Sequence, residues 1–187
     1  MDRFVCNSNT LVLLGINFES LVISKAEKGF QEDGFEYCES VIEKLSTNLT
    51  CCSISWEKVG FDRLKIESIF RENRNKFRFV YLVLLDCGVS QSEADKGFSF
   101  LGYDKITEVF DDVLSENYKK FQKFRGGVDE STILGESLLM DCPYIVAKNG
   151  FLTNMNESFM MANKEYRHEV AEFLYDSCVT IEFNNRR

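Results

Sequence analysis

Histidine, proline and long hydrophobic runs are scarce in this sequence, and each scarcity excludes a class of protein. His168 is the only histidine among 187 residues, which excludes a metal site built on several histidines. No apolar run approaches the roughly 20 residues of a membrane span. The apolar segment 11–16 also lacks the basic lead-in and cleavage site of a signal peptide. We therefore expect a cytoplasmic protein without membrane contact.

Linker-like and disulfide-like patterns are missing as well. The chain has one proline and no repeat or low-complexity stretch. A chain of this length can bury a proper core, so we expect residues 1–187 to form a single globular domain. The seven cysteines are odd in number and include no C-x-x-C pair. Without an export signal, they are expected to be reduced and mostly buried thiols.

Acidic residues outnumber basic ones by 30 to 22, which gives a net charge of −8. A chain with this charge repels nucleic acid and attracts basic partners. The acids line three predicted helices: Glu32, Glu36, Glu39 and Glu43, then Glu108, Asp111, Asp112 and Glu116, then Glu165, Glu169, Glu172 and Asp176. A solvated face explains any one stripe, whereas three stripes together favour a basic protein partner.

The hydrophobic pattern predicts strands and helices along the whole chain. Strands are expected at 11–17, 51–59 and 98–103, with a hairpin of 61–70 and 76–85 and a last strand at 179–183. Helices are expected at 33–49 and 106–124, residues 143–153 are expected to form a loop, and Asn154 with Glu157 suggests a capping box that opens a final helix. The predicted fold class is α/β, of the α+β type, with a mixed or antiparallel central sheet flanked by amphipathic helices.

Motifs that carry catalysis or bind cofactors are missing from the sequence. There is no G-x-S-x-G, no phosphate-binding glycine loop and no G-x-G-x-x-G. His168 has no partnered nucleophile and is interpreted as a surface or boundary residue. Cys51 and Cys52 lie in a predicted strand, which favours buried thiols over a nucleophile. We therefore expect no catalytic residue, no metal and no cofactor, and a protein that is not an enzyme.

Four short motifs in the second half point to one known family. A strand ends in the corner F-L-G-Y-D at 100–104, the loop N-G-F-L follows at 149–152, a short acidic helix starts at 156–162, and the last strand is predicted at 179–183. In this order they resemble immunity proteins of bacterial polymorphic-toxin and contact-dependent growth inhibition systems. Residues 1–90 show no such resemblance.

The resemblance implies a cytoplasmic protein that binds one cognate toxin domain and blocks it. Many such toxins are basic nucleases, in agreement with the acidic stripes. The predicted function is therefore non-catalytic neutralisation of a toxin domain, with a nuclease as the expected toxin, through acidic and aromatic surface. The predicted toxin-binding residues are Tyr103, Asp104, Glu108, Asp111, Asp112 and Glu116.

Two other function classes remain open at this point. The predicted hairpin at 63–78 carries Arg71, Arg74, Lys76 and Arg78 between aromatic residues, which is a pattern that could bind nucleic acid. Edge-strand cations that deter aggregation are the simpler interpretation of these residues. A small enzyme with an unrecognised site would instead need a pocket that joins His168 or a cysteine to several acids.

Overall fold

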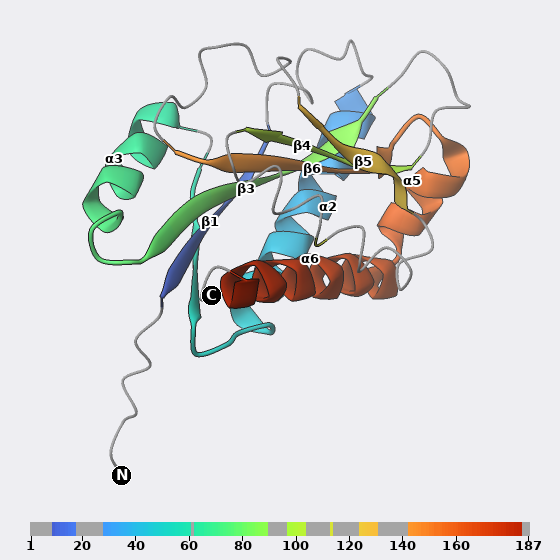
Figure 1. Ribbon diagram of the computed structural model, residues 1–187. Coiled ribbons are helices and arrows are strands. Elements are labelled where there is room, and N and C mark those ends of the chain that lie inside the picture. Colours follow the sequence, from blue (N-terminus) through green and yellow to red (C-terminus); the bar gives the residue numbers. More distant parts are fainter. Residues whose placement is uncertain are drawn as a thin grey trace.

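The computed structural model describes residues 9–17, 28–60, 62–89, 97–103, 113, 124–130 and 142–184. The described strands form one sheet in the order β2-β1-β3-β6-β4-β5 (Figure 1). Their bounds are β1 Thr10–Ile16, β2 Ile54–Lys58, β3 Phe79–Gly88, β4 Phe98–Tyr103, β5 Phe124–Glu130 and β6 Tyr144–Phe151. The described helices are α2 Lys28–Thr47, α3 Arg63–Asn73, α5 Met155–Ala162 and α6 Lys164–Asn184. None of these helices is long and apolar enough to cross a membrane.

The central strands β2, β1, β3 and β6 all run parallel. Parallel strands need crossover connections: α2 connects β1 to β2, and α3 connects β2 to β3, which lies on the other side of β1. Among the described strands, an antiparallel pairing occurs only at the margin, where β4 runs against β6 and β5 lies parallel to β4. The prediction of a mixed or antiparallel central sheet is therefore wrong. The continuous apolar runs of β1 and β3 belong to a parallel sheet that is covered on both faces.

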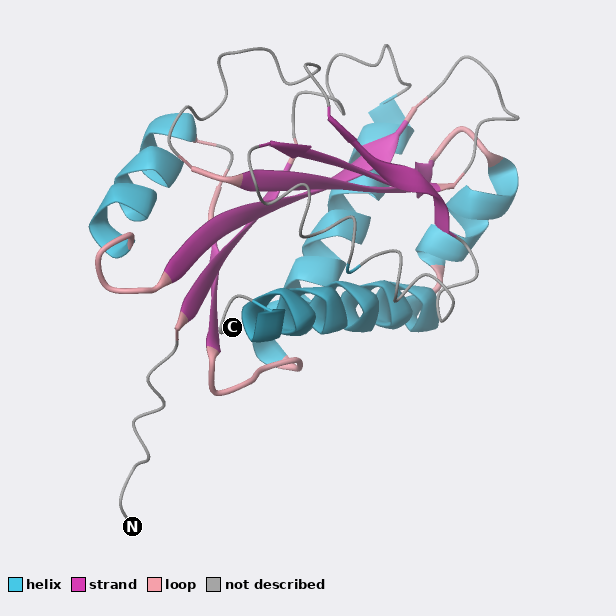
Figure 2. Cartoon of the chain, viewed as in Figure 1, coloured by secondary structure: helices cyan, strands magenta, loops and turns pink. Residues whose placement is uncertain are grey.

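Helices cover the sheet on two sides. In Figure 2 the helix α6 lies beneath the strands and α2 runs behind them. Buried side chains of both helices share one cluster with Val12, Val83 and Ile145. On the opposite face, Ile66 of α3 packs in a second cluster with Leu82. Both faces of the central strands are therefore buried, which places the two hydrophobic clusters back to back across the sheet.

Helix α3 stands where the sequence pattern predicted the first strand of a hairpin. Ile66 and Phe70 are one helical turn apart and both are buried, whereas Leu64 is 76% exposed. A strand would place Leu64 and Ile66 on the same face, and a helix does not. The polar residues 72–75 therefore end a helix instead of joining two strands, so the basic hairpin proposed to bind nucleic acid is not formed. Arg71 forms an ion pair with Glu67 one turn earlier on this helix, at 3.6 Å.

Helix α3 begins with a side-chain cap. Asp62 Oδ1 accepts hydrogen bonds from the backbone N–H groups of Leu64 and Lys65, at 3.0 and 3.2 Å. Replacement of Asp62 by Ala should lower the free energy of unfolding by about 1 kcal/mol, because these donors lose their acceptor. Denaturant unfolding measures this loss. Asp62→Asn is the matched control and should change stability by only a few tenths of a kcal/mol, since Asn caps helices as well as Asp does. Equal losses in the two variants would contradict the cap.

Other predicted elements have mixed outcomes. The strands predicted at 11–17 and 98–103 and the helix at 33–49 are confirmed as β1, β4 and α2. Asn154 does cap a helix, α5, and its side chain accepts from the Glu157 backbone N–H. The loop at 143–153 is wrong because β6 lies there. The last strand at 179–183 is wrong because α6 continues to Asn184, with Cys178 and Ile181 buried at helical spacing. Of the helix predicted at 106–124, Val113 is helical, Phe124 begins β5, and the rest lies outside the described residues.

Candidate functional site

The direction of strand addition reverses between β1 and β3. The strand that follows β1 along the chain, β2, lies on one side of it, and the next strand, β3, lies on the other. In open α/β sheets, ligands bind outside the carboxyl ends of the strands at such a switch point. The carboxyl ends of β1, β3 and β6 are therefore the place where this fold is expected to hold a ligand.

Three polar residues lie in a row across these strand ends, and we call Asn17, Asp86 and Lys148 the polar row. Leu85 is the register partner of Ile16, so Asp86 lies beside Asn17, and Lys148 is the register partner of Asp86. Side chains alternate between the two faces of a strand. Each residue of the polar row follows a member of one buried cluster by an even number of positions, so it lies on the same face of the sheet as that cluster. The cluster members are Leu13, Leu84 and Val146. The polar row therefore lies on the α3 side of the sheet, at its carboxyl edge.

The first two members of the row are buried and bonded to each other. Asp86 is 1% exposed and Asn17 is 4% exposed. Asn17 Nδ2 donates to Asp86 Oδ2 at 3.4 Å, and the backbone N–H of Cys87 donates to Asp86 Oδ1 at 2.8 Å. Asn17 Oδ1 is buried without a hydrogen-bond partner. A buried polar oxygen without a partner is costly in free energy, so a water molecule or another small donor is expected beside it.

Lys148 brings a positive charge to the same edge. It is half-buried, and its Nζ lies 5.9 Å from the centroid of the Phe151 ring. Because neighbouring strands are about 4.8 Å apart, the roots of the Lys148 and Asp86 side chains are adjacent. A carboxylate can accept a proton from water, and an ammonium group can stabilise negative charge on a carbonyl oxygen. The polar row can therefore bind and activate a carbonyl compound.

Glu157 of α5 holds the strand ends beside the row. Its Oε1 accepts from the backbone N–H of Gly97 at 2.7 Å, and its Oε2 accepts from the backbone N–H of Phe151 at 2.8 Å. Gly150, next to Phe151, has a φ of 110°, and a Cβ there would lie 2.9 Å from Glu157 Oε2. The carboxylate thus joins the start of β4 to the end of β6, three residues beyond Lys148.

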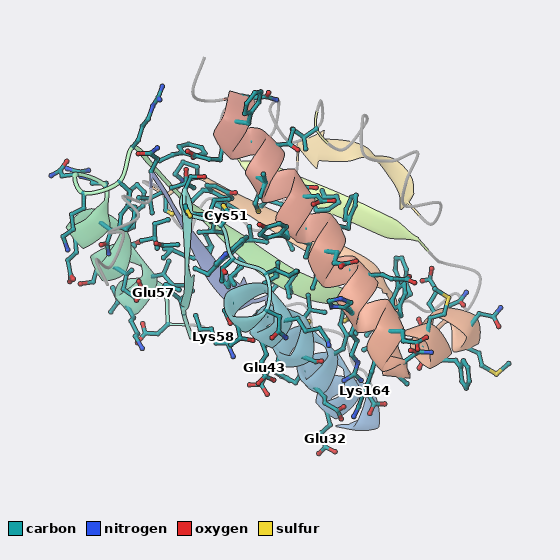
Figure 3. All side chains as sticks on the ribbon, turned by 90° about the horizontal axis from the view of Figure 1, so that it is seen from below. Glu32, Glu43, Cys51, Glu57, Lys58 and Lys164 are labelled. Carbon is teal, nitrogen blue, oxygen red and sulfur yellow. The ribbon has the colours of Figure 1, made fainter. Side chains whose placement is uncertain are left out.

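Replacement of Glu157 by Gln should lower the free energy of unfolding by about 1–3 kcal/mol, because an amide leaves one of the two backbone donors without an acceptor. Chemical denaturation of the purified protein measures the loss. The matched control is Glu43→Gln on α2, whose side chain is exposed and projects outward from the helix in Figure 3. The control should stay within about 0.5 kcal/mol of the wild type. Similar values for both variants would remove the role given to Glu157.

The predicted toxin-binding residues are not brought to the polar row by any described contact. Tyr103 ends β4, with Tyr144 as its register partner on β6. Tyr144 begins β6, so this pair lies at the amino end of that strand, away from Lys148. The remaining predicted residues, Asp104, Glu108, Asp111, Asp112 and Glu116, lie outside the described residues.

The histidine and the cysteines do not form a nucleophilic site in the described part of the chain. His168 Nε2 lies 3.3 Å from Glu172 Oε1 on the outside of α6. Cys38 and Cys87 are buried with their Sγ atoms 3.9 Å apart, and burial raises the pKa of Cys38 well above its ordinary value. Burial also raises the pKa of Cys178 to about 12. The Cys38 and Cys178 thiols therefore stay protonated at neutral pH and are poor nucleophiles. Cys51 is half-buried and Cys52 is exposed, so the prediction of a buried thiol is wrong for Cys52.

Many hydrolases use a bound zinc ion, and not a carboxylate, to activate water. Catalytic zinc usually takes three protein ligands from His, Cys, Asp and Glu. The polar row supplies one carboxylate, and the Lys148 ammonium next to it disfavours a second cation. His168, the only histidine of the chain, lies on α6, across the sheet from the row. The described residues contain no group of three or more such side chains that could hold a metal. The described residues therefore do not fit a zinc site.

Sequence reasoning missed all three members of the polar row. A signal was present, because each of the three is a polar residue that directly follows or interrupts a continuous apolar strand: L-L-G-I-N17, L-V-L-L-D86 and Y-I-V-A-K148. In a parallel sheet these positions meet at one edge. The signal could not be used without the strand order, and the third strand had been predicted as a loop.

Comparison with known proteins identifies the fold of the chain. No protein-family model and no curated protein matches the sequence. Among solved structures, the N-acetylmuramoyl-L-alanine amidase from Clostridium difficile 630 matches with 20% identity and a TM-score of 0.65, over 92% of this chain and 96% of that chain. The amidase Ami1 from Mycobacterium smegmatis matches with 13% identity and a TM-score of 0.66, over 95% and 98%. The CwlD amidase from Clostridioides difficile, solved in complex with the GerS lipoprotein, matches with 14% identity and a TM-score of 0.55, over 93% and 98%.

The chain has the fold of the N-acetylmuramoyl-L-alanine amidases. At these identities the likeness establishes the fold, and the activity has to be argued from the site. The resemblance to immunity proteins is wrong, because the solved structures that match this chain include several N-acetylmuramoyl-L-alanine amidases. The predicted toxin partner and the inhibition of a nuclease are wrong with it. The prediction of a non-enzyme is also wrong, since the proteins that share the fold are enzymes.

Proposed function

We propose that this chain is a hydrolase that acts on the amide bond between N-acetylmuramic acid and L-alanine in peptidoglycan, and that the polar row is its site. The observation that carries the proposal is the row itself. Asn17, Asp86 and Lys148 lie side by side at the switch point of the sheet, where this fold class binds its ligands. The amidase fold supports the same class of substrate.

The three side chains supply groups that hydrolysis of an amide bond needs. Lys148 is the most accessible member of the row and donates to the carbonyl oxygen. Asp86 and Asn17 are nearly inaccessible, so only a water molecule or a similarly small group reaches them. Asn17 Oδ1, which is buried without a partner, accepts from that water molecule. The row thus holds one water molecule beside the amide carbonyl that Lys148 binds.

Hydrolysis then follows from these positions. Asp86 takes a proton from water as the water oxygen attacks the carbonyl carbon, and Lys148 stabilises the negative charge that forms on the carbonyl oxygen. The C–N bond breaks, and the proton held by Asp86 passes to the leaving amine. The products are the carboxylic acid of the sugar part and the free amine of L-alanine, so the atoms of one water molecule are consumed.

The test uses the purified full chain and N-acetylmuramoyl-L-alanine, with the products followed by mass spectrometry. We expect N-acetylmuramic acid and L-alanine to appear in equal amounts, in proportion to the enzyme added. An intact substrate after long incubation, despite measurable binding, would contradict the hydrolytic step. An intact substrate without binding would contradict the choice of substrate as well.

A further inference from the structure

A polar cavity lies on the opposite side of the sheet from the polar row. It has a volume of about 200 Å³ and lies where α2, α5 and α6 meet, with Asp33, Glu36, Ser158 and Arg167 among its lining residues. In Figure 3 the labelled Glu32 of α2 and Lys164 of α6 mark this end of the two helices. The mechanism proposed above uses none of these side chains.

Arg167 is the unusual member of this cavity. Its side chain is only 10% exposed, yet it carries a permanent positive charge. Its Nε donates to the backbone oxygen of Met161 at 2.7 Å, and its Nη1 donates to Glu36 Oε1 at 3.0 Å. A guanidinium has five N–H donors, and Nη2 makes no hydrogen bond or ion pair with the described residues. A buried cation with unused donors in a cavity wall is prepared for a carboxylate.

The other polar groups of the cavity have the opposite charge. Asp33 and Glu36 are exposed and lie three residues apart, on one face of α2. Glu36 is shared with Arg167, whereas Asp33 makes no ion pair with the described residues. Leu152 and Met161 add buried apolar surface to the lining. The cavity therefore offers a carboxylate site, an ammonium site and an apolar contact within one small volume.

We propose that this cavity binds a free α-amino acid with an apolar side chain. The ligand's carboxylate pairs with Arg167, its ammonium group with Asp33 and Glu36, and its side chain lies against Leu152 and Met161. The inference is independent of the proposed hydrolysis, because the polar row lies on the other face of the sheet.

Isothermal titration calorimetry of the full chain tests the charge requirement. The probes are L-leucine, N-acetyl-L-leucine, which lacks the ammonium group, and L-leucinamide, which lacks the carboxylate. We expect L-leucine to bind with one site per chain and each blocked compound to bind roughly tenfold more weakly or not at all. Equal binding of L-leucine and L-leucinamide would overturn the role of Arg167, and lack of any L-leucine binding would overturn the proposal.

Two variants locate the site. Ser158→Leu fills the cavity without removing the Arg167–Glu36 pair, so it should abolish L-leucine binding with an unchanged melting temperature. Ser68→Leu, at an exposed position of α3 on the other face of the sheet, is the matched control and should bind normally. Undiminished binding by Ser158→Leu would place the ligand elsewhere. The Asp86→Asn variant should bind L-leucine as the wild type does, so failure of the hydrolase proposal leaves this result unaffected.

Discussion

Replacement of Asp86 by Asn should lower kcat/KM for N-acetylmuramoyl-L-alanine by about 10²–10⁴-fold while the protein stays folded. The amide has nearly the shape of the carboxylate and can still accept from the Cys87 backbone N–H, which now holds Asp86 Oδ1. It cannot take a proton from water, so the attacking water loses its general base. Initial rates of L-alanine release, measured with the melting temperature of the same samples, give the result.

The matched control for Asp86 is Asp176→Asn, an exposed aspartate on α6 outside the polar row. Its rate should equal that of the wild type. Lys148→Met should also lower kcat/KM strongly, because the developing oxyanion loses its positive neighbour. Hydrolysis that continues at the wild-type rate in Asp86→Asn would show that Asp86 is not the base.

Replacement of Ile66 by Ala should lower the free energy of unfolding by about 2–5 kcal/mol, the largest loss of stability that we predict for one side chain. Ile66 is 3% exposed and packs from α3 into the cluster on the polar-row side of the sheet. The lost contacts leave a cavity that the rigid β3 strand cannot fill. Urea unfolding followed by circular dichroism measures the change.

Leu64→Ala is the control within the same helix, and it should change stability by less than about 0.5 kcal/mol because Leu64 is 76% exposed. The pair also separates the helix from the hairpin that the sequence pattern suggested. In a strand, Leu64 and Ile66 would face the same way and both variants would lose similar stability. Comparable losses in the two variants would therefore contradict α3.

Helices that bury a single apolar face could be predicted from the sequence, because the spacing of their apolar residues is unambiguous. Helix α2 shows this, since Cys38, Ile42 and Leu45 are buried at steps of three or four. The capping of α5 by Asn154 is equally local. Residues 64–70 failed because Leu64, Ile66, Ile69 and Phe70 fit both a strand period and a helix period when burial is unknown.

The parallel sheet and its site could not be predicted, because both depend on pairing between distant segments. Residues 143–153 were predicted as a loop because they combine a proline with Asn149-Gly150, although the apolar run from Tyr144 to Ala147 forms part of a central strand. Because β6 was not predicted as a strand, Lys148 was assigned to a loop, and its position beside Asp86 could not be recognised. The short motifs at 100–104 and 149–152 then led to the wrong family, because they describe local turns and strand ends that different folds share.

The measurement that tests the central claim most directly is the place where N-acetylmuramoyl-L-alanine binds. We would titrate it into the ¹⁵N-labelled Asp86→Asn variant, which should bind the amide without cleaving it, and follow the backbone amide signals by NMR. The account predicts that the largest shift changes occur at Asn17, Cys87 and Lys148, at the carboxyl edge of β1, β3 and β6. Changes confined to the Arg167 cavity or to the acidic face of α2, or no change at saturating ligand, would contradict it.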